Sequence, residues 1–283
     1  MAARTSPTER QKRLGYEVRR MRTSSGISAE SASSLLGVDR SKISNIESGK
    51  RPISPERLRA LAAHCDSADD RYVEALTEMA QPGQRGWWEG YRSSLPPALL
   101  DIAELEANSV GMRAAYSMHM PGLLQTSEHA MAVFRMVIPQ LPEHKIALRL
   151  AHRMERQRVL DGPDAVPYLG IVHEAALRMR FGGRTVARAQ LEHLLQKSEQ
   201  ENITILVLPF EAGAFPGAGQ TVLYAEGAVP RLDTVQIDNS HGPDFLYEET
   251  QLAKYRAHLD WMERIALSPT DSRAFLHEMV RQF

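Results

Sequence analysis

The segment from Ser28 to Pro52 reads SAESASSLLGVDRSKISNIESGKRP. It predicts two short helices joined by a tight turn. Ser28 is placed to cap the first helix, because a serine hydroxyl accepts a hydrogen bond from a free backbone N–H of the first turn. Gly37 allows the turn, since a positive φ costs glycine little. Asp39 is the predicted cap of the second helix.

Apolar residues recur at helical spacing in both helices, which predicts one buried face on each. On these faces we place Ala32, Leu35, Leu36, Ile43 and Ile46. The residues left to point outward near the start of the second helix are Arg40, Ser41, Lys42, Ser44 and Asn45. A recognition helix presents its N-terminal residues to base edges in the major groove. The stretch therefore predicts a DNA-binding helix-turn-helix.

Charged residues around the second helix support this interpretation. Glu47 closes that helix, and Arg22 ends the helix that precedes the quoted stretch. A glutamate that faces the bundle without a partner would be costly, so we predict a bidentate ion pair between Glu47 and Arg22. Lys50 and Arg51 follow the helix, where cations reach the phosphate backbone.

Residues 14–65 resemble the Cro/CI-like (XRE-type) helix-turn-helix domains of phage and bacterial repressors. The resemblance lies in the Arg22 and Glu47 pair, in Gly37 and in the segment ISNIESGKRP. The base-reading positions that it implies are Arg40, Ser41 and Asn45. The phosphate-holding positions that it implies are Lys42, Lys50 and Arg51. The full predicted DNA-binding set is Ser28, Arg40, Ser41, Lys42, Ser44, Asn45, Lys50 and Arg51. The glutamine that commonly begins the first helix of the motif and clamps phosphate is Ala29 here, so the clamp must come from elsewhere.

Charge is distributed unevenly along the chain. Residues 1–60 carry 13 Lys and Arg against 6 Asp and Glu, which gives +7, so the other residues carry −8 of the total of −1. A basic head on an acidic body is expected when only the head meets nucleic acid. The first 11 residues are polar and predicted to be mobile. The cations around them either form an arm over the DNA or belong to a solvated tail: Arg4, Arg10, Lys12 and Arg13.

Length and composition place the chain among ordinary globular proteins with two domains. It has 283 residues, 43% of them hydrophobic and 24% charged. The apolar runs are too short to span a membrane, and the first residues lack a secretory signal. The single cysteine, Cys65, fits a reducing compartment. We therefore expect a cytoplasmic protein with no membrane-bound part.

We predict a multidomain chain in three parts. Residues 1–80 form an all-α, five-helix helix-turn-helix DNA-binding domain, and residues 81–86 (QPGQRG) form a linker rich in helix breakers. Residues 87–283 form a mixed α/β (α+β) domain for regulation, dimerisation or partner binding. Its predicted helices are 97–107, 123–138, 143–160, 175–181, 186–200, 249–265 and 271–282. Its predicted strands are 113–120, 166–172, 203–208, 221–225 and 234–238. Most charges of the helix over 143–160 are predicted to lie on a solvated face.

The second domain also resembles a known group, the C-terminal half of a regulator family abundant in high-GC Gram-positive bacteria. The resemblance lies in MPGLLQTSEHA, in RMERQRVL, in FGG before QLEHLL and in ITILVLPFEAGAFPG. In that family the domain follows an XRE-type head and has no assigned function. It is often described as antitoxin-like, because the gene neighbours one for a small partner protein. The resemblance implies a small-protein or small-molecule partner.

Three large aromatics, Trp87, Trp88 and Tyr91, directly follow the linker. Such residues can line an effector pocket or stack a base. Neighbouring aromatics face different ways on a helix, so we favour a clamp that packs the linker onto the second domain. If an effector binds, the predicted region is these three residues and the loop 209–219, which contains Phe215.

The second domain shows no arrangement that argues for catalysis. His173 and Glu174 lack the H-E-x-x-H spacing of a zinc helix. His241, Asp238 and Asp244 are interpreted as turn-forming residues of one loop. We predict no enzyme, no cofactor and no metal site.

We predict a transcriptional regulator, a repressor in the style of the resembling family, that binds double-stranded DNA. A homodimer would place two heads on a pseudo-palindromic operator. The second domain would dimerise and respond to a small molecule or a small protein. One alternative is an antitoxin-like protein that neutralises a small partner and autoregulates its operon. The other is an enzyme that its head tethers to DNA.

Overall fold

A computed structural model describes residues 6–65, 69–81, 86–217 and 219–283, which fall into two compact units. The head unit comprises Met1–Gly90 and Leu99–Leu105, and the sheet unit comprises Tyr91–Ala98 and Glu106–Phe283. The first unit is helical and the second contains a mixed sheet, which confirms the predicted fold class. Most of the predicted linker, residues 82–85, lies outside the described residues.

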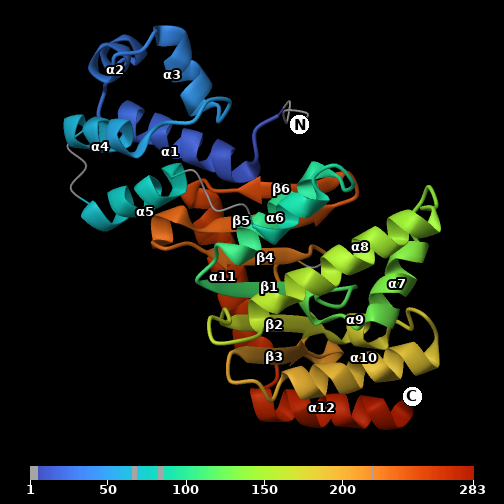
Figure 1. Ribbon diagram of the computed structural model, residues 1–283. Helices are drawn as coiled ribbons and strands as arrows, with labels where there is room; N and C mark the ends of the chain where they lie inside the picture. The colour runs from blue at the N-terminus through green and yellow to red at the C-terminus, as the bar shows by residue number, and fades with distance from the viewer. Residues whose placement is uncertain (1–5, 66–68, 82–85, 218) are drawn as a thin grey trace. The chain divides into compact units, whose positions relative to one another are not determined.

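In the part of the head that the structure describes, five α-helices precede Gly90 (Figure 1). They are α1 (Glu9–Ser24), α2 (Ala29–Leu36), α3 (Arg40–Glu47), α4 (Pro55–His64) and α5 (Asp70–Ala80). Ser28 caps α2 by accepting a hydrogen bond from Ser31 N, and Gly37 ends α2 with a φ of 60°. The buried apolar side chains of the head include Leu14, Val18, Met21, Ala32, Leu36, Ile43, Ile46, Leu58, Leu61, Tyr72 and Leu76.

The predicted mobile arm is wrong where the structure describes it. α1 begins at Glu9, because Thr8 and Gln11 form a capping box in which each backbone N–H donates to the other side chain. The arm cations that belong to this helix are Arg10, Lys12 and Arg13. Arg4 lies outside the described residues.

Arg13 instead takes part in a buried cluster that joins α1 to α5. The carboxylate of Glu17 is fully buried, and it lies 3.0 Å from Arg13 Nη2 and 2.7 Å from Arg20 Nη2. Tyr72 Oη of α5 donates to the same carboxylate at 2.5 Å. Two cations and a hydroxyl offset the cost of burying this charge. Arg13 therefore stabilises the head and is not free to reach DNA.

Two predicted details of the helix-turn-helix also differ. Leu35 is 39% exposed, because the residues of its helix that turn into the core are Ala32, Ser33 and Leu36. Asp39 occupies the cap position of α3, but its side chain accepts no backbone hydrogen bond there. Its carboxylate lies 2.8 Å from Lys42 Nζ, and this contact lowers the pKa of Asp39.

Within the described residues, the sheet unit is built on one six-stranded sheet with the order β3-β2-β1-β4-β5-β6. The strands are β1 (Gly111–Tyr116), β2 (Tyr168–His173), β3 (Ile203–Leu208), β4 (Val222–Glu226), β5 (Thr234–Asn239) and β6 (Gly242–Leu246). β1, β2 and β3 run parallel, whereas β4, β5 and β6 continue the sheet antiparallel. Ala114 lies at the centre, with Gly170 of β2 and Leu223 of β4 as its neighbours.

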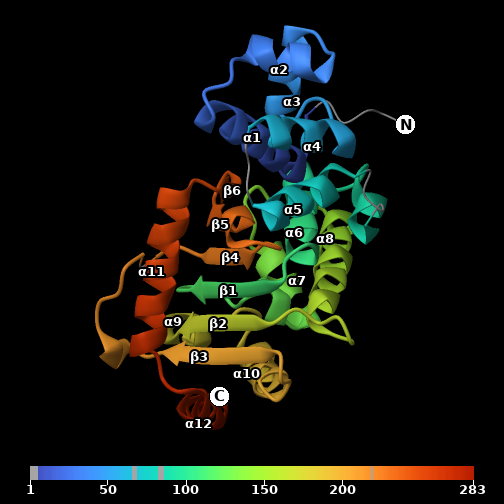
Figure 2. The same ribbon diagram turned by 90° about the vertical axis from the view of Figure 1, so that its left-hand side faces the viewer.

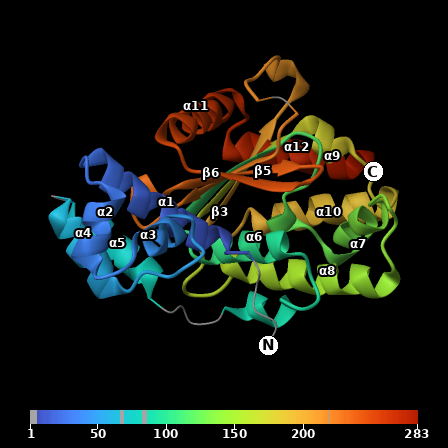
Figure 3. The ribbon, with the colours of Figure 1, turned by 90° about the horizontal axis from the view of Figure 1, so that it is seen from above.

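Helices cover both faces of this sheet (Figures 2 and 3). α10 (Arg184–Lys197) and α12 (Pro269–Gln282) pack on one face through Leu191 and Leu276. α11 (Glu249–Ile265) covers the other face through Leu252 and Leu259. α7 (Ser127–Arg135) and α8 (Glu143–Arg156) pack on each other, and α9 (Glu174–Arg178) follows β2. Most of α6 (Pro97–Ala107) belongs to the head unit, through Leu99–Leu105. Among the described residues, every helix is too short or too polar to cross a bilayer.

Three local predictions for the second domain are wrong. The helix over 123–138 is a 3-10 turn, Gly122–Leu124, followed by α7. Asp238 and Asp244 do not share a loop, since they lie in β5 and β6 on either side of a hairpin turn that contains His241. The solvated face of α8 is wrong for Arg156, which is 8% exposed. Its Nε and Nη2 donate to Glu106 at 2.8 and 2.5 Å.

Candidate nucleic-acid interface

Two glycines let α1 lie close to the end of α3. A Cβ on Gly15 would stand 2.6 Å from Ile46 O and 2.8 Å from Gly49 N. Gly49 has a φ of 73°, and a Cβ there would stand 2.7 Å from Gln11 O of α1. Because any larger side chain would meet backbone atoms on both sides, this contact needs glycine at each position. It fixes the distance between α1 and α3.

The structure brings Arg22 and Glu47 together as a bidentate pair. Arg22 Nε lies 2.5 Å from Glu47 Oε1, and Arg22 Nη2 lies 3.1 Å from Oε2. The third nitrogen, Nη1, donates to Ile27 O at 2.7 Å. Each side chain is 11% exposed, and the bond to Glu47 raises the pKa of Arg22. One guanidinium therefore ties α1 to α3 and to the loop that leads into α2.

Most of the predicted DNA-contacting side chains are exposed. The exposed ones are Ser28, Arg40, Ser41, Ser44, Asn45, Lys50 and Arg51. Lys42 is partly buried and pairs with Asp39, so part of its charge is already neutralised. α3 has 8 residues, and Arg40 and Ser41 open its first turn. The helix thus offers an uninterrupted polar edge from its N-terminus to Asn45.

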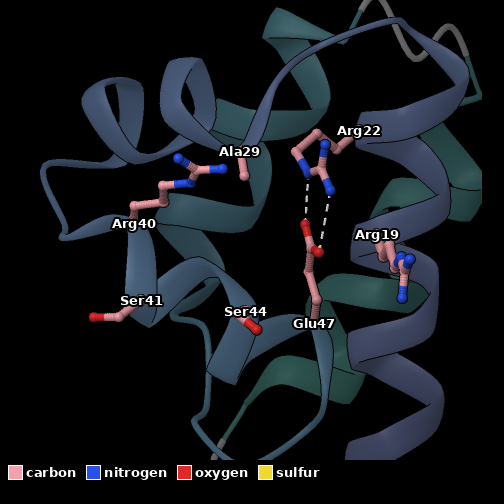
Figure 4. Close-up of a pocket in the computed structure, with 7 residues that line it drawn as sticks. All are labelled: Arg19, Arg22, Ala29, Arg40, Ser41, Ser44 and Glu47. Carbon is pink, nitrogen blue, oxygen red and sulfur yellow. Dashed lines mark hydrogen bonds and ion pairs between the residues drawn. The ribbon is translucent and has the colours of Figure 1, made fainter.

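A hollow of about 540 Å³ lies between α1, the start of α2 and α3 (Figure 4). We call it the α1–α3 hollow, and its lining residues are Arg19, Arg22, Ala29, Arg40, Ser41, Ser44 and Glu47. Arg19 and Arg22 come from α1, whereas Arg40 and Ser41 stand on the α3 side, and Arg40 extends toward Ala29 (Figure 4).

The α1–α3 hollow is positively charged. Three arginines and one glutamate line it, and Arg22 already holds the glutamate. Among the described residues, no carboxylate pairs with the exposed side chains of Arg19 and Arg40. A concave surface with two unpaired guanidinium groups attracts anionic groups such as phosphate.

Sequence reasoning missed Arg19. A signal was present, because Arg19 precedes Arg22 by three residues and therefore shares its face of α1. The neighbouring Arg20 turns the other way, toward the buried Glu17.

The predicted effector residues have separate ring partners. Trp87 and Trp88, in the head unit, pack edge to face with centroids 5.9 Å apart. Tyr91, in the sheet unit, lies edge to face on His152 at 5.2 Å. Phe215 lies 5.3 Å from the His173 ring and packs against the core beneath α11. Tyr91 and Phe215 therefore do not contact the same histidine.

No three His, Cys, Asp or Glu side chains gather as a metal site in the described parts of the chain. Glu174, one of the residues considered for chemistry, is buried and accepts a hydrogen bond from Phe210 N at 2.9 Å. It also pairs with Arg178. Through these contacts Glu174 joins the end of β2 to the segment that follows β3.

Two protein families match the chain. Residues 13–76 match a helix-turn-helix domain, and residues 99–278 match the family described as Domain of unknown function (DUF5753). The second match covers more than half of the chain, so the chain belongs to that family. The helix-turn-helix match indicates a DNA-binding regulator. No curated protein and no solved structure matches the chain significantly.

Proposed function

We propose that this member of the DUF5753 family is a sequence-specific transcriptional repressor of the XRE type. It binds a pseudo-palindromic operator as a homodimer, with one head in each of two successive major grooves about 34 Å apart. Its C-terminal domain dimerises and responds to a small molecule or a small protein. Duplex DNA as the ligand implies that the protein acts in the cytoplasm.

One observation carries the proposal. α3 carries four exposed polar side chains, Arg40, Ser41, Ser44 and Asn45, on a helix held by the Arg22–Glu47 pair. A rigid helix with a polar outer edge fits the major groove, which admits one α-helix. The net charge of +7 over residues 1–60 favours the approach of DNA.

The side chains suggest distinct roles at the DNA. Arg40 can donate two hydrogen bonds to O6 and N7 of guanine, and Asn45 can bond both N6 and N7 of adenine. Ser41 and Ser44 add shorter donors and acceptors. Lys50 and Arg51 reach phosphates, as does Lys42 when it leaves Asp39. Ser28 lies at the start of α2, where a hydroxyl can also bond a phosphate.

Two kinds of partner are candidates for the C-terminal domain, a small molecule and a small protein. A small-molecule effector would bind around Trp87, Trp88, Tyr91 or Phe215, and would act only through different affinities for two arrangements of the dimer. The antitoxin-like alternative needs a protein partner instead. Met136 and Ile138, in the connection between α7 and α8, are 66% and 93% exposed, and such apolar side chains favour contact with another protein.

Footprinting with the full-length protein and the DNA upstream of its own gene tests the function. We expect protection of two half-sites, with centres one helical turn or a multiple of it apart. Protection no stronger than on random DNA would contradict a sequence-specific regulator. Mass spectrometry of the purified native protein separates the two partners, because a co-purifying small protein supports the antitoxin-like alternative and a metabolite supports the effector.

A further inference from the structure

We propose that the α1–α3 hollow binds a backbone phosphate of duplex DNA and that Arg19 of α1 is the cation that holds it. This inference rests on the proposed function and adds to it a contact outside the recognition helix. The predicted DNA-binding residues all lie between Ser28 and Arg51, whereas Arg19 belongs to the preceding helix. Arg19 would position the head on the duplex without reading its sequence.

The charges of α1 single out Arg19. Arg13 and Arg20 of the same helix pair with the buried Glu17, and Arg22 pairs with Glu47. Among the described residues, the guanidinium of Arg19 has no such partner, and its side chain is exposed at the rim of the hollow. A free guanidinium can donate two parallel hydrogen bonds to a phosphate, which a paired one cannot do without losing its carboxylate.

The geometry of the groove assigns a phosphate rather than a base to Arg19. A helix with its side chains is about 10–12 Å across and the major groove is about 12 Å wide, so α3 fills the groove. A residue on the helix beside it then meets the wall of the groove, where the backbone runs. Arg19 lies on the α1 side of the hollow, opposite Arg40 (Figure 4).

A small residue at position 29 leaves the hollow open. Ala29 begins α2 and lines the hollow with only a methyl group. The hollow keeps about 540 Å³, more than a phosphodiester group needs. A longer side chain at the start of α2 could hold the phosphate itself. With Ala29 there, the anchoring charge comes from across the hollow, where Arg19 stands.

The test measures DNA affinity of the full-length protein against salt concentration, with a 30-base-pair duplex of random sequence and with the protected promoter fragment. Arg19→Ala should weaken binding to both duplexes alike, by about threefold to tenfold. It should also reduce the slope of log affinity against log salt by about one for each bound head. Arg19→Lys should keep the slope, because lysine still neutralises a phosphate.

Arg71→Ala is the matched control. Arg71 is an exposed arginine of α5, so its loss changes the net charge equally but removes nothing from the hollow. If both alanine variants change the slope by the same amount, the effect is net charge alone and the inference fails. If Arg19→Ala weakens only the promoter fragment, Arg19 reads sequence and the phosphate assignment fails. A wild-type protein that binds neither duplex would instead overturn the proposed function.

Discussion

Two arginine–glutamate pairs, one in each unit, share their geometry but differ in their surroundings. Arg22–Glu47 joins α1 to α3 with each side chain 11% exposed, and it lines the α1–α3 hollow. Arg156–Glu106 joins two residues of the sheet unit, with side chains 9% and 3% exposed. The first pair therefore lies where a ligand can approach, and the second is sealed inside its unit.

The difference shows what each pair can do. A pair beside a ligand surface sets the position of the side chains that touch the ligand, and its loss should alter binding as well as stability. A sealed pair acts on stability alone, and removing one partner leaves a charge in a medium that solvates it poorly. Variants that break each pair separate these two consequences.

The largest loss of stability is expected from breaking the Arg156–Glu106 pair. Arg156→Ala leaves the Glu106 carboxylate buried without its bidentate donor, so the sheet unit should lose about 3–5 kcal/mol of unfolding free energy. Pulse proteolysis in urea measures this, because it follows each unit through its own fragments.

The control replaces both partners at once. The double variant Arg156→Met and Glu106→Leu removes both charges and keeps the volume apolar, so it should recover most of the lost stability. If the single variant unfolds at the wild-type urea concentration, the pair is not sealed and the contrast between the two units disappears.

The second prediction is that the sheet unit loses stability as the pH falls. Burial lowers the pKa of His129 to about 4 and of His152 to about 3, with smaller contributions from His119 and Arg153 in the first case and from Arg156 and Arg153 in the second. An unfolded histidine, with a pKa near 6.5, gains its proton before the folded one as the pH falls. The contribution of these two histidines to stability is therefore fully present above pH 6.5. It is lost as the pH falls from 6.5 toward 4 for His129 and toward 3 for His152.

Urea unfolding at pH 7 and at pH 5 checks the acid effect. The sheet unit should weaken at pH 5, whereas the head unit, whose His64 is exposed, should change little. His129→Phe removes one of the titrating groups and should flatten the dependence. Equal loss in both units would show that buried histidines are not its cause.

A third and smaller loss of stability is expected when the Arg22–Glu47 pair is broken. Glu47→Ala leaves the largely buried Arg22 without its carboxylate, and the head should lose about 1–3 kcal/mol of unfolding free energy. Unlike Arg156→Ala, it should also weaken specific DNA binding, since α3 loses its tie to α1. Unchanged melting of the head would mean that the Arg22–Glu47 pair contributes nothing to the stability of the head. Unchanged affinity for the promoter would mean that the pair does not position the DNA-binding side chains.

The two pairs also show how far sequence could lead. Arg22 and Glu47 were predictable because a compact motif places both ends within a known pattern of helix, turn and helix. Arg156 was not, because α8 carries many charges and only packing decides which of them turn inward. Glu106 lies 50 residues away, and no local pattern links it to Arg156.

Other parts of the fold were hidden for similar reasons. Gly15 and Gly49 are needed because each one lies against the backbone of another segment, and the sequence does not show which segments are in contact. β6 was missed because its residues alternate in no clear way and include Pro243, so it lacks the signature of a half-buried strand. Arg19 was within reach, since its spacing from Arg22 placed both on one face of α1.

Two variants of the head, compared on two duplexes, show whether α3 reads the DNA sequence. Affinities of Arg40→Ala and Lys50→Ala are measured on the protected promoter fragment and on random duplex over a range of salt. We predict that Arg40→Ala costs about 1–3 kcal/mol on the promoter and less on random DNA, whereas Lys50→Ala weakens both alike and lowers the salt slope by about one. Equal losses on both duplexes for Arg40→Ala would contradict sequence reading by α3.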